Sequence, residues 1–201
     1  MKKRLGFNIV VLGIITSGKE TQARILRDKY ALKFVETGVF SRNLMKAKTK
    51  DGEWAKRTVG AGKPLPTILL QRFLEKEITN RPKNKDLLFL GGRLKPEAQL
   101  IKKLIVNNAK EKLFVLYITL PEKEIYKRSY ARKESNIKKV YKILDEKKII
   151  SRRIKWHKDQ VGKTIKYYQK LGILKKINGN QTIAKVSKDI EKEIKRFSTL
   201  S

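Results

Sequence analysis

The sequence predicts an α/β fold in which a parallel β-sheet of about five strands is covered by helices on both faces. Three observations predict it. Short apolar runs alternate with longer segments of helical periodicity. The first run, at residues 8–12, is a short, continuous apolar run, as in a strand that is buried on both faces of a parallel sheet. The first run leads through a glycine-bounded loop directly into a helical segment, which is typical of α/β domains.

Each strand is predicted from an apolar run, and the helices from the segments between the runs. The expected strands are residues 8–12, 33–35, 87–90, 113–118 and 172–177. The last of these is the least apolar, so it is expected near an edge of the sheet. The expected helices are residues 18–30, 67–78, 97–106, 122–132, 150–171 and 183–197. Within the fifth helix, we expect Trp156 to be buried and His157 to be exposed.

Two polar stretches interrupt this alternation. Residues 46–66 are polar and contain glycine and proline, and residues 133–142 are short and basic. Both are expected to be mobile excursions from the sheet, where such folds often place lids. No internal repeat or low-complexity linker separates the rest, so a single domain over residues 1–201 is expected.

Charge is the unusual feature of the composition. The chain has 50 Lys and Arg against 19 Asp and Glu, a formal net charge of +31, and the excess is spread along its whole length. Such an excess indicates either a polyanionic partner such as RNA or a lysine-rich solvated surface, and composition leaves both open. The absence of cysteine excludes disulfides, thiol nucleophiles and cysteine-based zinc sites, and a single histidine excludes histidine-rich metal sites.

The N-terminus imitates a secretion signal without completing one. A basic head precedes an apolar run, but the run ends at Thr16 and no small-residue cleavage pattern follows. No segment reaches the ~18–20 apolar residues of a membrane span. A cytoplasmic protein without membrane contact is expected.

The glycine-bounded loop has the pattern of a phosphate-binding P-loop. Gly13 and Gly18 enclose four residues, and Lys19 follows them at the start of a helix. Backbone N–H groups of such a turn point at phosphate oxygens, the helix N-terminus adds partial positive charge, and the lysine adds a full charge. The fold class expected is therefore a P-loop NTPase three-layer sandwich. Glu20 occupies the position where a hydroxyl residue is common. Its carboxylate should repel bound phosphates unless it turns to solvent or helps to hold Mg²⁺.

Over nearly its whole length the chain resembles the adenylate kinase family of nucleoside monophosphate kinases. The segment GIITSGKETQA at Gly13–Ala23 is similar to the family pattern G-x-P-G-x-G-K-G-T-Q-A. Further similar segments are ETG at 36–38 with Arg42, GKPLP at 62–66, LGGRLKPEAQ at 90–99, KRSYAR at 127–132, RRI at 152–154 and YYQKLG at 167–172. Only about nine residues separate Arg132 from Lys142, so the chain resembles the short-lid type.

The resemblance implies transfer of the γ-phosphoryl group of ATP to AMP, with Mg²⁺ carried by the nucleotide, in a monomer that has no metal site of its own. Residues 37–80 would form the acceptor subdomain and residues 133–143 the lid. The implied catalytic residues are Lys19, Arg132, Lys142 and Arg153. The implied donor-binding residues are Gly13, Ser17, Gly18, Lys19, Thr21 and Arg128. The implied acceptor-binding residues are Thr37, Gly38, Arg42, Val59, Gly92, Lys95 and Gln99.

Several positions depart from the family pattern. Glu20 replaces a glycine, Gly91 an aspartate that orders the waters of Mg²⁺, and Lys95 an arginine that grips the acceptor phosphate. The lid pair of aspartates is Leu144–Asp145, and Val39 replaces an aspartate. These changes predict nucleotide binding with impaired turnover. The alternative hypothesis is a catalytically impaired relative that uses its basic surface to bind RNA or the ribosome through salt-sensitive phosphate contacts.

Overall fold

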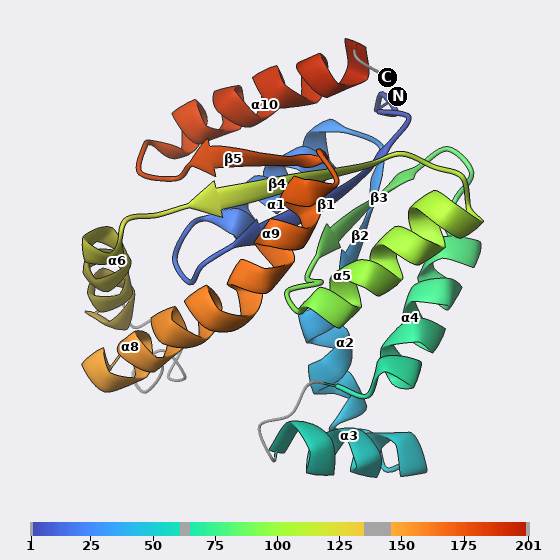
Figure 1. Ribbon diagram of the computed structural model, residues 1–201, viewed down its shortest axis with the longest axis horizontal. Helices are drawn as coiled ribbons and strands as arrows, with labels where there is room; N and C mark the ends of the chain where they lie inside the picture. Colours follow the sequence, from blue (N-terminus) through green and yellow to red (C-terminus); the bar gives the residue numbers. More distant parts are fainter. Residues whose placement is uncertain (1, 61–64, 135–145, 200–201) are drawn as a thin grey trace. The chain divides into compact units, whose positions relative to one another are not determined.

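The computed structural model describes residues 2–60, 65–134 and 146–199, and Figure 1 shows the order of its elements. Five strands form one sheet in the order β2-β3-β1-β4-β5, and the β2–β3 and β4–β5 pairs are parallel. The strands are β1 (Asn8–Gly13), β2 (Leu32–Glu36), β3 (Asp86–Leu90), β4 (Leu113–Thr119) and β5 (Leu174–Asn178). The predicted fold class is confirmed, and so is the edge position of the fifth strand.

The helices occupy the segments between the strands. They are α1 (Lys19–Lys29), α2 (Thr37–Leu44), α3 (Lys50–Gly60), α4 (Thr67–Thr79), α5 (Lys95–Lys102), α6 (Glu122–Glu134), α8 (Lys147–Trp156), α9 (Gly162–Lys170) and α10 (Ile183–Thr199). Two π-helical segments extend or interrupt them, η1 (Lys103–Asn108) after α5 and η2 (His157–Val161) between α8 and α9.

Three sequence expectations need correction. No helix was expected at residues 37–44 or within the stretch 46–66, but α2 and α3 form there. The exposures of Trp156 and His157 are the reverse of the prediction. Trp156 is 41% exposed, whereas the His157 ring is buried and its Nε2 lies 3.1 Å from the Tyr117 hydroxyl. The hydroxyl gives the imidazole a polar partner, so its burial needs no charged neighbour.

The chain divides into two compact units, each described here by itself. The first comprises Met1–Val10 and Leu26–Phe114, and the second comprises Val11–Ile25 and Val115–Ser201. In the part of the chain that the structure describes, no helix is both long and apolar enough to span a membrane.

The first unit is tied to its N-terminal segment through Asp86. This buried carboxylate, at the start of β3, accepts hydrogen bonds from the Arg4 guanidinium at 2.6 Å and from the backbone N–H groups of Leu5 and Gly6 at 2.8 and 3.0 Å. A buried carboxylate is stable only when such donors replace water. These bonds hold the segment that leads into β1.

The second unit contains β4 from Val115 onward, and Val115, Leu116 and Ile118 are buried in it. Helix α10 covers part of this unit with Val186, Ile190 and Ile194, which are spaced four residues apart and are buried. That spacing places three side chains on one face of a helix, and burying them stabilises the helix by roughly 1.5–3 kcal/mol each.

Candidate active site

The phosphate loop begins where β1 ends. All six residues of β1 are buried, and the chain then turns through a left-handed conformation at Thr16 (φ 57°) and at Gly18 (φ 84°) before α1 starts at Lys19. A side chain at Gly13 would overlap the Ser17 hydroxyl and approach the Ile118 carbonyl oxygen at 3.1 Å. The loop therefore requires glycine at 13 for space and favours it at 18 for conformation.

The side chain of Ser17 is an additional polar group of this loop. It is 2% exposed, and its hydroxyl has no hydrogen-bond partner among the described residues. Thr21, in the first turn of α1, is exposed. The left-handed turns, the helix N-terminus and the unpartnered hydroxyl fit an anionic oxygen ligand such as a phosphate group.

Lys19 turns back over the loop. Its ammonium group lies 3.4 Å from the Ile14 carbonyl oxygen and 3.0 Å from the Glu20 carboxylate, and only 14% of its side chain is exposed. Partial burial would raise the pKa of Glu20, but attraction to Lys19, hydrogen bonds and attraction to Arg132 together hold that pKa below its ordinary value. Lys19 and Arg132 thus both attract the same carboxylate, Lys19 at 3.0 Å and Arg132 more weakly.

Arg128 of α6 connects this loop to the segment after β5. Its guanidinium donates to the Thr16 carbonyl at 3.5 Å and to the Gly179 carbonyl at 3.1 Å, and it pairs with Glu124 at 2.9 Å. A side chain at Gly179 would lie 2.6 Å from the Thr119 carbonyl oxygen and 3.2 Å from the Ser17 carbonyl oxygen. Arg128 therefore stands beside a tightly packed glycine turn.

Arg132 and Arg153 are carried by α6 and α8, and both are half-buried. The two helices contact one another through an apolar cluster of Ile125, Ile150 and Ile154 that includes Ile14 of the phosphate loop. This packing holds α6 and α8 against each other and so positions Arg132 and Arg153. Lys142, the Leu144–Asp145 pair and nearly all of the predicted lid lie outside the described residues.

In the first unit, β2 leads directly into α2 at residues 36–42, here called the acceptor segment. Thr37 is the first residue of α2, and a side chain at Gly91 would overlap its hydroxyl oxygen and lie 2.9 Å from its Cβ. Arg42 is exposed, and its guanidinium lies over Gly38, where a Cβ atom would be 3.4 Å away. Thr37 is thus a neighbour of Gly91, and Gly38 is a neighbour of Arg42.

The segment after β3 carries the other predicted acceptor residues. Gly92 is buried with φ 67°, and Lys95 and Gln99 are exposed one turn apart on the same face of α5. Glu97 accepts a hydrogen bond from the Leu94 N–H at 3.2 Å, and burial raises the pKa of this carboxyl group despite that bond and the nearby Arg93.

Val59 lies apart from these residues along the chain, half-buried in α3, and residues 61–64 of the predicted 62–66 turn fall outside the described residues.

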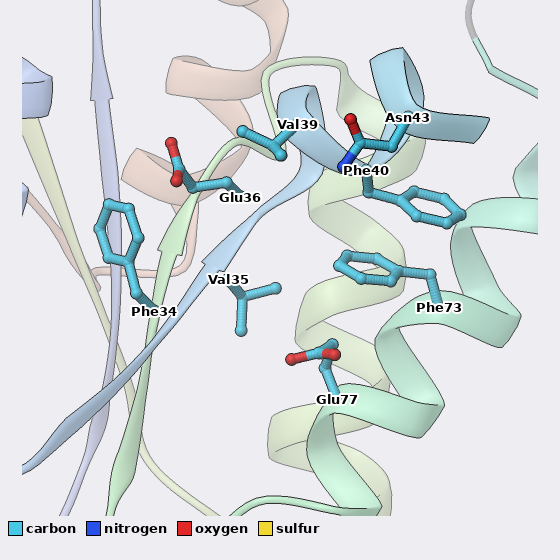
Figure 2. A pocket seen from close by; sticks show the side chains of 8 residues that line it. All are labelled: Phe34, Val35, Glu36, Val39, Phe40, Asn43, Phe73 and Glu77. Carbon is cyan, nitrogen blue, oxygen red and sulfur yellow. The ribbon is translucent and has the colours of Figure 1, made fainter. Parts of the chain in front are cut away.

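A groove of about 310 Å³ lies beside the acceptor segment (Figure 2). Its walls come from β2, α2 and α4, and the rings of Phe40 and Phe73 stack in it with centroids 4.0 Å apart. Helix α2 lines the groove with Val39, Phe40 and Asn43, and Arg42 of the same helix is not among the lining residues. The groove is therefore not formed by the predicted acceptor residues.

Sequence reasoning missed the Gly179 turn and the groove. The turn had a signal, because Asn-Gly-Asn at 178–180 is typical of a turn after a strand. The groove had none, since it depends on how α2 and α4 pack. Among the described residues, no group of three His, Asp or Glu side chains could hold a metal ion.

Comparison with known proteins identifies the family of this chain. A family model described as adenylate kinase matches residues 11–173. The chain is 28% identical to an adenylate kinase of Methanothrix thermoacetophila, over 94% of this chain and 99% of that protein. It is 24% identical to one of Fusobacterium nucleatum (94% and 98%) and 28% identical to one of Bacteroides fragilis (93% and 97%).

The match includes the phosphate loop, the acceptor segment and the arginine-bearing helices α6 and α8. These findings support a nucleoside monophosphate kinase and give no support to the RNA-binding alternative. The chain belongs to the adenylate kinase family.

Proposed function

We propose that the protein transfers the γ-phosphoryl group of ATP to AMP and forms two molecules of ADP. The observation that carries this proposal is the loop at the end of β1, in which two left-handed residues precede a helix N-terminus and Lys19 turns back over the turn. Such a loop binds the phosphates of a nucleoside triphosphate. Family membership supports phosphoryl transfer as the reaction and a nucleoside monophosphate as the acceptor.

The second unit supplies the donor side in this proposal. The loop residues Gly13, Ser17, Gly18 and Thr21 surround the donor phosphates, and Lys19 holds them. Arg128 borders the donor base beside the Gly179 turn, because its guanidinium already lies against that backbone. Arg132 and Arg153, with Lys142, place positive charge around the transferred group, which is what phosphoryl transfer mainly needs.

The first unit supplies the acceptor side. Thr37, Gly38, Val59, Gly92 and Gln99 contact the acceptor nucleoside. Arg42 and Lys95 hold its phosphate, Arg42 with a planar fork and Lys95 with a single point charge. Residues 37–80 act as the acceptor subdomain and residues 133–143 as a short lid.

Mg²⁺ enters with ATP and neutralises charge on its phosphate oxygens. Gly91 and Lys95 offer less to the metal and the acceptor phosphate than the family pattern does, so we expect turnover below that of a chain with the full pattern. In this proposal the protein acts as a monomer in the cytoplasm.

A coupled assay of ADP formation tests the proposal with AMP, CMP, GMP and UMP as acceptors. We expect ADP formation from ATP and AMP that falls by at least about a hundredfold in Lys19→Ala, since a charge that stabilises the transition state is lost. Lys163→Ala, which removes an exposed lysine of α9, serves as the matched control. No Lys19-dependent activity with any monophosphate would refute the proposal.

A further inference from the structure

Glu20 occupies an unusual position beside the loop lysine. Consecutive residues of a helix point about 100° apart, so their side chains do not normally meet. Here the Lys19 ammonium reaches the Glu20 carboxylate at 3.0 Å because the lysine turns back over the loop toward Ile14. The Glu20 carboxylate therefore lies at the ammonium group that would hold donor phosphate oxygens.

The Glu20 carboxylate is the ion-pair partner of the Lys19 ammonium, which lies 3.0 Å from it. The side chain is also 56% exposed, so it is free to change its direction when a ligand arrives. An ionised carboxylate next to a triphosphate repels it, unless a cation lies between the two groups.

Mg²⁺ bound to a nucleotide commonly takes one or two protein carboxylates in addition to phosphate oxygens and waters. Position 20 offers a carboxylate of this kind in the first turn of the loop helix.

We propose that Glu20 is a ligand of the Mg²⁺ ion that accompanies the donor nucleotide. The inference rests on the proposed binding of ATP at the phosphate loop. Lys19 exchanges the Glu20 carboxylate for phosphate oxygens, and Glu20 turns to the metal ion. Without Mg²⁺, the Glu20 charge opposes the triphosphate, so the residue makes donor binding depend on the metal.

Isothermal titration calorimetry of ATP binding, in Mg²⁺ and in EDTA, tests this role without reference to turnover. The proteins compared are the wild type, Glu20→Gln, Glu20→Asp and the control Asp28→Asn, which neutralises an acid ~12 Å along the same helix. We expect Mg²⁺ to tighten ATP binding in the wild type. Glu20→Gln should reduce that gain by about tenfold or more, as expected for a lost metal-site partner.

Glu20→Gln should also bind free ATP at least as tightly as the wild type, since a repulsive charge is removed. Glu20→Asp should keep most of the metal dependence, and Asp28→Asn should keep all of it. An unchanged ratio of affinities in Glu20→Gln would overturn the inference, as would an equal loss of affinity with and without Mg²⁺. A wild type that binds no ATP in either condition would instead refute the proposed function.

Discussion

Substitution of Gly91 by alanine tests whether Thr37 has taken the space of a side chain at that position. A Cβ atom there would overlap the Thr37 hydroxyl oxygen and lie 2.9 Å from Thr37 Cβ and 3.1 Å from its Cγ2. Carbon atoms pack best at about 3.5–4.0 Å, so all three contacts between the added Cβ atom and Thr37 would be too short. Thr37 begins α2 and follows β2 directly, so its backbone has little freedom to move.

Overpacking of this kind costs about 1–3 kcal/mol of folding free energy. For a chain of this length, a loss of about 2 kcal/mol lowers the melting temperature by roughly 4–8 °C. Scanning calorimetry of Gly91→Ala measures this loss. The matched control is Gly162→Ala at the start of α9, where an added Cβ would meet nothing within 4 Å. That substitution should be neutral or stabilise the helix by about 0.5–1 kcal/mol.

A double-mutant cycle identifies Thr37 as the cause. Thr37→Ala removes the hydroxyl and Cγ2, so Gly91→Ala should cost less in that background, with a coupling energy of about 1 kcal/mol or more. A steric conflict with Thr37 is excluded if Gly91→Ala lowers the melting temperature no more than Gly162→Ala does. It is also excluded if Gly91→Ala loses the same folding free energy with and without Thr37→Ala. If the steric conflict exists, restoring an aspartate at 91 alone should destabilise the first unit.

Three further predictions concern the fold and the donor side. Asp86→Ala removes the acceptor of four hydrogen bonds and should lower the free energy of unfolding by about 2–4 kcal/mol, measured by urea denaturation. Arg81 and Asn8 lower the pKa of Glu111 against partial burial, so the stability from this carboxylate is present above about pH 4.5 and is lost as pH falls through the lowered pKa. Glu111→Gln should therefore flatten the dependence of melting temperature on pH below about pH 4.5. Arg128→Lys cannot reproduce the paired donation to the carbonyls beside the loop and should weaken ATP binding about tenfold, without an effect on AMP binding, by calorimetry.

The strands could be predicted from the sequence because their burial leaves continuous apolar runs, and β1, β3 and β4 are almost wholly buried. Helix α3 escaped prediction because it is short and polar, contains Gly52 and Gly60, and is followed by a stretch with further glycine and proline residues. The π-helical turns η1 and η2 escaped because the apolar spacing continues through them.

The phosphate loop was predictable because its glycines, lysine and flanking elements are contiguous in the chain. The contact of Arg128 with Gly179 was not, since it joins residues 51 positions apart. The overlap that a side chain at Gly91 would have with Thr37 could not be predicted either. It arises because the ends of β2 and β3 lie beside each other, with Glu36 paired to Leu90. The ion pair of Lys19 and Glu20 required the three-dimensional turn of the lysine, because sequence neighbours on a helix point apart.

The most direct test of the central claim, that one chain binds a donor and an acceptor nucleotide together, is calorimetric binding of a dinucleotide with two adenosines joined by five phosphates. We expect one molecule bound per chain, with affinity lowered at least about tenfold by Lys19→Ala on the donor side and by Arg42→Ala on the acceptor side. Binding that neither substitution weakens, or no binding at all, would contradict it.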